Sequence, residues 1–218
     1  MNPQTGLEAL TKLRRKILAM ATLVEENLGK ALSALRANDA ELAREVVEGD
    51  AAVDAMQIEA EDMAAILIAT RQPVARDLRE LVAVFKITGN LERAGDHAAH
   101  LAKSVIKFSE KEPFYSLERL ERMTQTGKEM IRASISAYLN QDADAARKAA
   151  AFDDKIDREH KALAEELLGL MKERPKLVKK AVRVLNTSNQ LERLGDHITN
   201  ICESVIYMVE CKHEELNE

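Results

Sequence analysis

The 218-residue sequence has no tryptophan, only 3% aromatic residues and only two cysteines, and it contains no long apolar run. A helix needs about 18 or more consecutive apolar residues to cross a bilayer, so we predict no membrane-spanning segment. The first residues, MNPQTGLEALTKLRRKIL, lack the apolar block of a signal peptide. Cys202 and Cys211 form no CxxC pair, which favours two reduced thiols in a cytoplasmic protein.

The sequence also lacks an excess of positive charge: it has 32 Lys and Arg residues and 37 Asp and Glu residues, for a net charge of −5. Contacts to nucleic-acid phosphates need a basic surface, so we predict no nucleic-acid partner. The sequence also lacks a glycine-rich phosphate loop, a GxSxG motif and a Cys/His nucleophile pair. We therefore predict that the protein is not an enzyme.

The sequence is rich in helix-forming residues with helical apolar spacing. Ala, Leu, Glu, Lys and Arg dominate a composition that is 46% hydrophobic and 32% charged. Four prolines and several capping residues divide the chain, since proline is disfavoured inside a helix. We predict an all-α protein with six helices, at about 7–37, 40–70, 74–109, 116–140, 143–173 and 176–211.

The chain also repeats itself. Residues 90–108 (NLERAGDHAAHLAKSVIKF) and 190–208 (QLERLGDHITNICESVIYM) are identical at nine of nineteen positions. The matching residues of these two stretches are 100 positions apart. Further upstream the separation is 103 positions, and there Asp39, Asp50 and Asp54 match Asp142, Asp153 and Asp157. We predict two tandem, similar three-helix bundles, residues 1–111 and 112–218, related by pseudo-two-fold symmetry.

Acidic residues lie on the face of each hairpin that we predict to point inward. Glu92, for example, belongs to a third-helix stripe of otherwise apolar or small residues that runs from Val74 to Ile106. Folding each helix pair as an antiparallel hairpin about its proline-containing turn places the acids of one helix opposite those of the other. The two predicted clusters are Asp50, Asp54, Glu92 and Asp96 in the first half, and Asp153, Asp157, Glu192 and Asp196 in the second.

Clustered anions need compensating cations. Two carboxylates about 5 Å apart repel by roughly 3 kcal/mol at an effective dielectric of about 20. Oxygen-rich clusters on facing helices are typical of metal sites, so we predict one metal site in each half. The alternatives are an ion-pair network with Arg93, Arg193 and nearby lysines, or a solvated face. Gly95 and Gly195 directly precede acids of the two clusters, where they leave room for a cation or a helix to approach.

Two histidines are additional candidate metal ligands. His100 lies four residues after the last acid of the first cluster, and His160 lies three after an acid of the second, as in the Glu-x-x-His step of di-iron bundles. The counterpart of His160 is Gln57, so the two sites are not equivalent. His97 and His197 directly follow acids and point about 100° away from them, which favours a cap or a surface contact.

Basic residues gather at both hairpin tips. This pattern favours either complementation of the helix-end dipoles or a docking surface for an acidic partner. The residues are Arg71, Arg76 and Arg79 at the first tip, and Lys172, Arg174, Lys176, Lys179 and Lys180 at the second.

At these residues the sequence resembles the PhoU family of phosphate-signalling regulators over essentially its whole length. The family's repeated Glu/Asp-x-x-x-Asp motif matches both clusters, at Glu92-Arg-Ala-Gly-Asp96, Glu192-Arg-Leu-Gly-Asp196, Asp50-Ala-Ala-Val-Asp54 and Asp153-Asp-Lys-Ile-Asp157. The stretch Arg71-Gln-Pro-Val-Ala-Arg-Asp-Leu-Arg79 is a family hallmark, which the second hairpin replaces with Arg174-Pro-Lys-Leu. Arg71, Arg76, Asp77 and Arg79 are therefore candidate partner-docking residues.

The resemblance implies two three-helix bundles with multinuclear metal sites, with iron as the first expectation and zinc or another metal as alternatives. It implies a cytoplasmic, commonly dimeric protein that acts with the ATPase of a phosphate ABC transporter and with a phosphate-sensing histidine kinase. Such a protein reaches the membrane only through its partners, and it helps to repress the phosphate-starvation response when phosphate is plentiful.

Two other hypotheses stay open. A ferritin-like di-iron enzyme would need two Glu-x-x-His steps in one bundle, whereas this sequence offers a single Asp-x-x-His step. The protein could instead be an accessory protein of another phosphate transporter, a hypothesis that the stretch Pro-Val-Ala-Arg-Asp-Leu disfavours.

Overall fold

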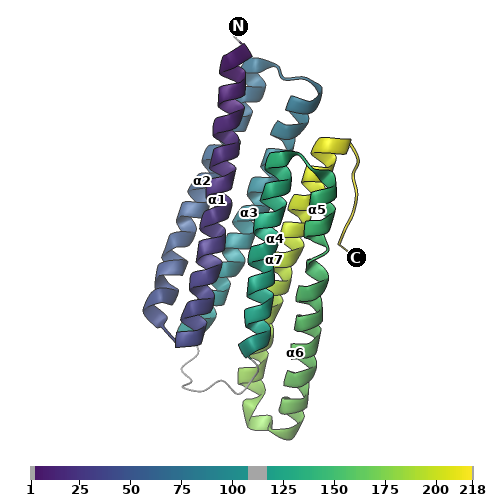
Figure 1. Ribbon diagram of the computed structural model, residues 1–218. Helices are drawn as coiled ribbons and strands as arrows, with labels where there is room; N and C mark the ends of the chain where they lie inside the picture. Colours follow the sequence, from purple (N-terminus) through teal and green to yellow (C-terminus); the bar gives the residue numbers. More distant parts are fainter. Residues whose placement is uncertain (1–2, 108–116, 218) are drawn as a thin grey trace.

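The computed structural model describes residues 3–107 and 117–217, and within these ranges every regular element is helical (Figure 1). The predicted all-α class is confirmed. The predicted turn at residues 111–113 and the predicted domain boundary at 111/112 lie outside the described residues. The elements are α1 (Pro3–Ala37), α2 (Ala40–Arg71), α3 (Ala75–Lys107), α4 (Leu117–Asn140), α5 (Ala143–Ala150), α6 (Asp153–Glu173), the 3₁₀ turn η1 (Pro175–Leu177) and α7 (Val178–Glu210).

The helix boundaries follow capping chemistry at equivalent places in both halves. Asp39 caps α2 by accepting the backbone N–H groups of Glu41 and Leu42, each at 3.0 Å. Asp142 caps α5 in the same way, by accepting the N–H of Ala145 at 2.9 Å. A short polar side chain in this position satisfies donors that have no partner within the helix, which explains why both helices begin there.

The predicted single helix over 143–173 is wrong, because it breaks into α5 and α6 at residues 151–152. At the break, backbone hydrogen bonds span three residues instead of four. The N–H of Phe152 binds the carbonyl of Ala149 at 3.2 Å, and the N–H of Lys155 binds the carbonyl of Phe152 at 3.0 Å. No proline or glycine marks the break, and alanine favours helix, so tertiary packing here overrides local preference. The break lies directly before Asp153, the first residue of α6.

The two halves lie side by side, with α1–α3 in one and α4–α7 in the other (Figure 1). The antiparallel helices α3 and α7 pack along each other at the centre, and α1 contacts α4 beside them. One continuous apolar core runs through both halves. None of the described helices has the combined length and apolar character that crossing a bilayer requires. Side chains that are fully buried in this core include Leu13, Ile17, Met20, Leu81, Leu120, Met130 and Tyr138.

The third-helix stripe that we predicted to face inward is largely exposed between Val74 and Phe85. Val74 is 75% exposed, and Leu78 and Phe85 are each 37% exposed. Other residues of the stripe, such as Leu81 and Thr88, are buried as predicted, and the core of α3 also includes Val84 and Leu91, because α3 packs against α1, α2 and α7 at once. The acids of the first cluster therefore lie at the margin of the α2/α3 hairpin, partly open to solvent.

After α7 the chain turns back on itself. Cys211 adopts a left-handed conformation with φ of 61°, and its N–H binds the carbonyl of Tyr207 at 2.9 Å. Residues 211–217, which we call the tail, then run back beside α5 (yellow in Figure 1). Arg147 of α5 holds the tail by an ion pair to Glu214 at 2.7 Å, and it also pairs with Glu210, the last residue of α7, at 2.8 Å. Leu216 packs against the core.

Candidate metal centres

The structure brings the acids of the first cluster into one electrostatic neighbourhood. Burial raises the pKa of Asp50, and the charges of Asp96 and Asp54 raise it further. Burial and the charge of Asp96 likewise raise the pKa of Glu92, with smaller contributions from Asp54 and Asp50. These mutual effects require the α2 and α3 carboxyls to lie close together, as the hairpin register predicted.

The second cluster repeats this arrangement more tightly. The pKa of Asp153 is raised to about 7. Burial makes the largest contribution, and the charges of Asp157, Asp196 and Glu192 add to it. Burial and then repulsion by neighbouring acids also raise the pKa values of Glu192 and Asp196. At neutral pH an Asp153 carboxyl in these surroundings is therefore only partly ionised unless a cation joins it.

Asp153 also carries a buried oxygen that lacks a hydrogen-bond partner among the described residues. This atom, Oδ1, lies over Gly195, where an added Cβ would come within 2.1 Å of it. The equivalent contact in the first half is looser, because a Cβ on Gly95 would lie 3.5 Å from Asp50 Oδ1. A buried acceptor without a donor is unfavourable, and a bound cation would satisfy it.

The carboxyls are close, yet they do not converge on a common point. Among residues 3–107 and 117–217, no three His, Cys, Asp or Glu side chains are placed so that they could hold one metal ion. The donor chemistry still fits a hard cation, because both clusters offer carboxylate oxygens, and the partnerless Asp153 oxygen points to the same fit. The predicted ligand sets therefore stay predictions.

Arginine compensates part of the charge in the first cluster. Arg93 lies 3.4 Å from Glu92 and 3.3 Å from Asp96, although its own side chain is 60% exposed. Exposed pairs of this kind contribute little, about 0–1 kcal/mol each. The ion-pair alternative thus accounts for some of the first cluster, but repulsion and burial still keep the pKa of Glu92 raised.

The two additional candidate ligands have different surroundings. His160 is half-buried, and its Nδ1 lies 3.0 Å from the hydroxyl oxygen of Ser188 on α7. His100 is exposed, with its ring centroid 6.3 Å from that of His97. Its charge acts on Asp50, so it lies near the first cluster.

Two of the predicted docking residues make contacts within the molecule. Arg76 donates a hydrogen bond to the side-chain oxygen of Gln141, and Arg79 donates to the backbone carbonyl of Met208 at 3.4 Å. Both bonds join the first hairpin tip to the second half. Arg71 and Asp77 are exposed at the end of α2 and the start of α3.

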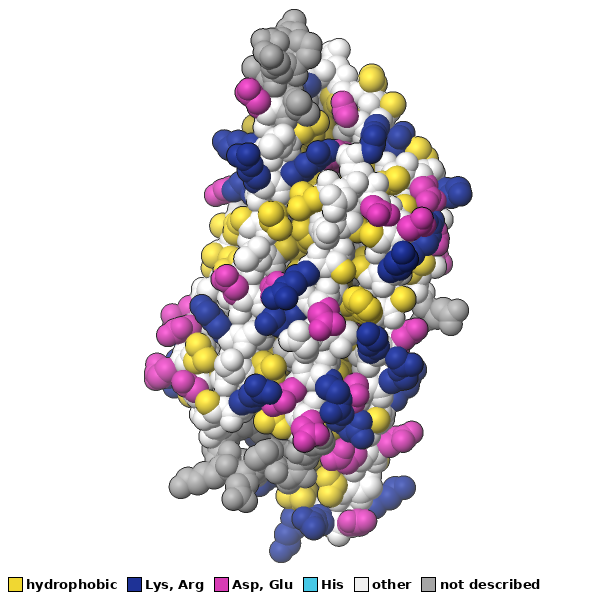
Figure 2. Space-filling view, in the orientation of Figure 1, with side chains coloured by type: hydrophobic (Ala, Val, Ile, Leu, Met, Phe, Trp, Pro, Cys, Tyr) yellow, Lys and Arg dark blue, Asp and Glu magenta, His cyan; other side chains and the backbone are white. Residues whose placement is uncertain are grey.

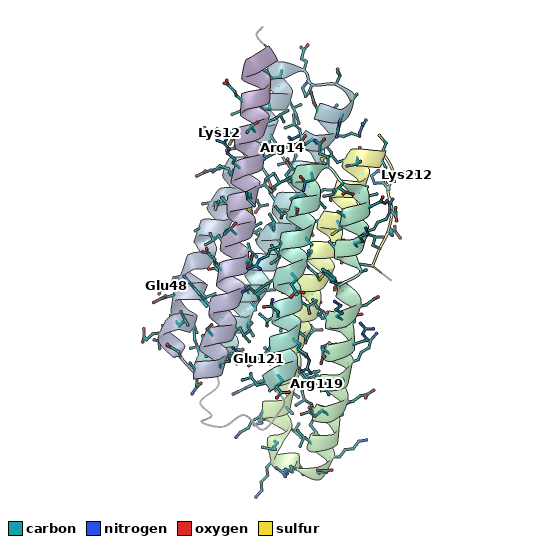
Figure 3. All side chains as sticks on the ribbon, viewed as in Figure 1. Lys12, Arg14, Glu48, Arg119, Glu121 and Lys212 are labelled. Atoms are coloured by element: carbon teal, nitrogen blue, oxygen red, sulfur yellow. The ribbon has the colours of Figure 1, made fainter. Side chains whose placement is uncertain are left out.

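A buried ion-pair network links the halves, and it was not predicted from the sequence. Glu80, only 2% exposed, accepts two hydrogen bonds of 2.6 Å from Arg14, which projects from α1 in Figure 3. Tyr138 and Gln141 of the second half also donate to it, at 3.3 and 3.2 Å. Glu80 follows Arg79 and directly precedes the apolar residues 81–85, a pattern that is equally typical of an exposed acid near a helix start.

His97 and His197 join the halves by a reciprocal pair of hydrogen bonds. The Nδ1 of His97 lies 2.8 Å from Gln190 Oε1, and the Nδ1 of His197 lies 2.9 Å from Asn90 Oδ1. Burial lowers the pKa of both histidines, which favours neutral rings that donate from Nδ1. The expectation of a cap or surface contact was wrong for both residues, because they lie where α3 and α7 cross.

The fold and the site together define a class: an all-helical protein of two similar three-helix units, each with acidic residues gathered between its second and third helices. The profile of the PhoU domain matches residues 17–105 and again 120–205. The chain belongs to the PhoU family, and the double match confirms the two similar units.

Relatives and solved structures agree with this assignment. The chain is 34% identical over 210 residues to the phosphate-specific transport system accessory protein PhoU homolog of Clostridium acetobutylicum, covering 96% of each chain. It is 35% identical over 202 residues to the PhoU protein of Edwardsiella tarda, covering 92% of this chain and 82% of the relative. These names describe accessory proteins, which agrees with the prediction that the chain is not an enzyme.

The crystal structure of the phosphate transport system regulatory protein PhoU from Streptococcus pneumoniae superposes with a TM-score of 0.89 at 32% identity, over 96% of this chain and 98% of that one. PhoU from Pseudomonas aeruginosa gives the same TM-score and identity over 94% and 99%. Nothing in the site or in these relatives supports the ferritin-like alternative.

Proposed function

We propose that this protein is a metal-binding accessory protein of phosphate-specific transport that restrains phosphate uptake and the phosphate-starvation response. Family membership and the printed names of the relatives support the link to phosphate transport. The observation that supports metal binding is the repeated carboxyl cluster, above all the buried Asp153 oxygen without a partner. Metal binding and docking on a partner are tested by separate experiments.

The metal would be held between the second and third helices of each half. Asp50, Asp54, Glu92 and Asp96 would supply oxygens in the first half, and their counterparts from Asp153 to Asp196 in the second. When bound, a divalent or trivalent cation would neutralise the repelling acids and favour their ionised forms. Iron is the first expectation, and zinc or another metal is the alternative.

Metal analysis of protein purified without added metal tests this proposal. The double substitution Glu92→Gln with Asp96→Asn should remove about half of the bound metal, because the other half keeps its own cluster. Glu192→Gln with Asp196→Asn should remove the other half. The control, Glu48→Gln with Asp62→Asn on exposed positions of α2, should change nothing. Equal metal content in all three variants and the parent would contradict the proposal.

Docking on a partner is supported by an apolar patch that recurs in both halves, at the start of α3 and at the start of α7. Because α3 and α7 are antiparallel, the two patches lie at opposite ends of this helix pair (Figure 1). On α3, Leu78 and Val82 are 37% and 40% exposed, and on α7 the equivalent Val178 and Val182 are 38% and 42% exposed. Large apolar side chains that recur at equivalent exposed positions favour a protein contact. We propose that these two patches, together called the docking surface, contact the ATPase of the phosphate ABC transporter and a phosphate-sensing histidine kinase, and that the protein forms a homodimer.

A binding assay with the purified transporter ATPase tests the docking surface. Val82→Glu with Val182→Glu should weaken binding by about 10-fold or more, since each buries a charge in an apolar contact. Leu18→Glu, at an exposed apolar residue of α1 that is 45% exposed, is the control and should bind normally. Equal effects of all these changes would show that the surface is not the docking site. Sedimentation of the parent protein tests the homodimer.

A further inference from the structure

Two cavities flank the crossing of α3 and α7, and they are equivalent under the internal repeat. The first, which we call the tail cavity, has a volume of about 290 Å³, and the second, the basic cavity, about 310 Å³. The tail cavity is lined on the helices by Lys86, Asn90, Asn200, Glu203, Ser204 and Tyr207. The repeat places five of these on residues of the basic cavity, which are Asn186, Gln190, His100, Lys103 and Ser104.

An acidic segment of the chain forms one wall of the tail cavity. Residues 213–215, which are His-Glu-Glu, line it together with the two helices. The N–H of Leu216 donates to Glu203 at 2.8 Å, and the ring of His213 stacks on Tyr207 with centroids 4.5 Å apart. The molecule thus shows an extended segment that packs along the helices at this cavity.

The basic cavity is similar in volume and equivalent in position, but its helix walls are cationic, whereas Lys86 and Glu203 balance each other on the helix walls of the tail cavity. Lys103 stands where the tail cavity has Glu203, and Arg183 and His100 add two further nitrogen-bearing side chains. Among the described residues no peptide segment lines this cavity; its walls are α3 and α7 alone. Cationic walls with Asn, Gln, Ser and Thr donors complement carboxylates.

A third cavity, of about 780 Å³, lies between these two. It shares Asn200 with the tail cavity and His100 and Gln190 with the basic cavity, and Arg93 and Arg193 line it together with Asp96 and Asp196. Asn217 at the end of the tail lines it too. The three cavities, which we call the groove, follow the α3/α7 crossing, and within residues 3–107 and 117–217 the tail is the one segment besides these helices that lines them.

We propose that the basic cavity binds an extended acidic peptide segment of a partner protein, which would pack along α3 and α7 there as the tail packs along them at the equivalent cavity. A glutamate or aspartate of that segment would pair with Lys103, and its backbone would bond to the amides of Asn186 and Gln190. The occupant is acidic because the cavity differs from the tail cavity chiefly by gaining positive charge. This proposal does not depend on the metal sites or on a transporter partner.

The probe is a labelled peptide with the sequence of residues 211–217, with serine replacing the cysteine and both ends blocked, titrated into the full chain by fluorescence anisotropy. In the full chain the covalently attached tail outcompetes added peptide for the tail cavity, so saturable binding reports the basic cavity. Lys103→Glu should weaken binding by about 10-fold or more, and Lys30→Glu on exposed α1 by less than about 2-fold.

Lys103 is close enough to Asp50 to act on its carboxyl, so a second variant is needed. Asn186→Glu adds negative charge from α7 and should weaken binding by a similar factor, whereas Asn140→Glu at the exposed end of α4 should not. A peptide with both glutamates replaced by glutamine should not bind. Absence of saturable binding, equal losses in test and control variants, or displacement of the peptide by inorganic phosphate beyond the effect of chloride at equal ionic strength would each overturn the proposal.

Discussion

Asp153 is the residue whose environment differs most from that of a free acid. Its pKa of about 7 in the folded chain lies above the unfolded value of about 3.9. A raised folded pKa means that the stability it contributes is present below about pH 4 and is lost as the pH rises through about 7. This carboxyl therefore lowers the folding stability of the metal-free protein near neutral pH.

Replacing Asp153 by asparagine should remove this penalty. With chelator present at pH 8, the Asp153→Asn variant should melt about 3–6 °C above the parent, which corresponds to about 1–2 kcal/mol after allowance for solvent screening. At pH 4.5 the variant and the parent should melt at the same temperature. Without chelator the order at pH 8 should reverse, because a bound cation favours the ionised acid. The exposed change Asp62→Asn is the control. A difference that is the same at both pH values would contradict this account.

Gly95 and Gly195 form a matched pair for a second test. A Cβ on Gly195 would collide with Asp153 Oδ1 at 2.1 Å and crowd Ile156 at 3.3 Å, whereas one on Gly95 meets Val53 at 3.2 Å. Alanine favours helix over glycine by about 1 kcal/mol. Gly95→Ala should therefore be close to neutral, and Gly195→Ala should destabilise by about 1–3 kcal/mol in urea unfolding. Equal effects would mean that Asp153 moves aside freely.

At the scale of helices, prolines and caps made most of the fold predictable from the sequence. Asp39 and Asp142 begin helices as expected, and the hairpin register correctly brought the acids together, because both rest on local geometry. The break at residues 151–152 and the exposure of the Leu78 stripe were missed, because each depends on which neighbour a helix packs against. Apolar spacing alone does not distinguish a core face from a docking face.

The tail is held by the ion pair of Arg147 with Glu214, by the stacking of His213 on Tyr207 and by the hydrogen bond of the Leu216 N–H to Glu203. Arg147→Ala should speed amide exchange at Leu216 by about 10-fold or more, since the tail then opens locally without global unfolding. The melting temperature should fall by less than about 3 °C, because partly exposed ion pairs contribute little. Arg122→Ala removes the ion pair between α4 and α6 and is the control. Unchanged exchange at Leu216 would show that other contacts hold the tail.

At the scale of the whole molecule, Figure 2 shows basic and acidic side chains interspersed over one face. Cross-links such as the pair of Arg119 with Glu159, at 2.9 Å, tie neighbouring helices together near the lower end of α4 in Figure 3. The continuous core and the buried Glu80 network join the two halves. We therefore expect the halves to unfold together.

The substitution Gln190→Leu, at the crossing of α3 and α7, tests whether the two halves unfold together. It leaves the N–H of His97, which is 8% exposed, without its partner. The cost should be about 1–3 kcal/mol, and Asn90→Leu should cost less because His197 is more exposed. Urea unfolding followed by a tryptophan placed in either half should still give one transition. Two separate transitions would show that the halves are independent domains.

The reciprocal bonds at this crossing also bear on how such a chain could arise. His97 bonds to Gln190 while His197 bonds to Asn90, so each half supplies the donor and the acceptor that the other half needs. This is the self-complementary pattern of a symmetric dimer interface, in which the same patch meets itself across a two-fold axis. A single ancestral half could have paired with its own copy through the same face. The present chain then corresponds to such a dimer with its two subunits fused, after which one end of the shared groove was covered by the tail and the other end gained its charge.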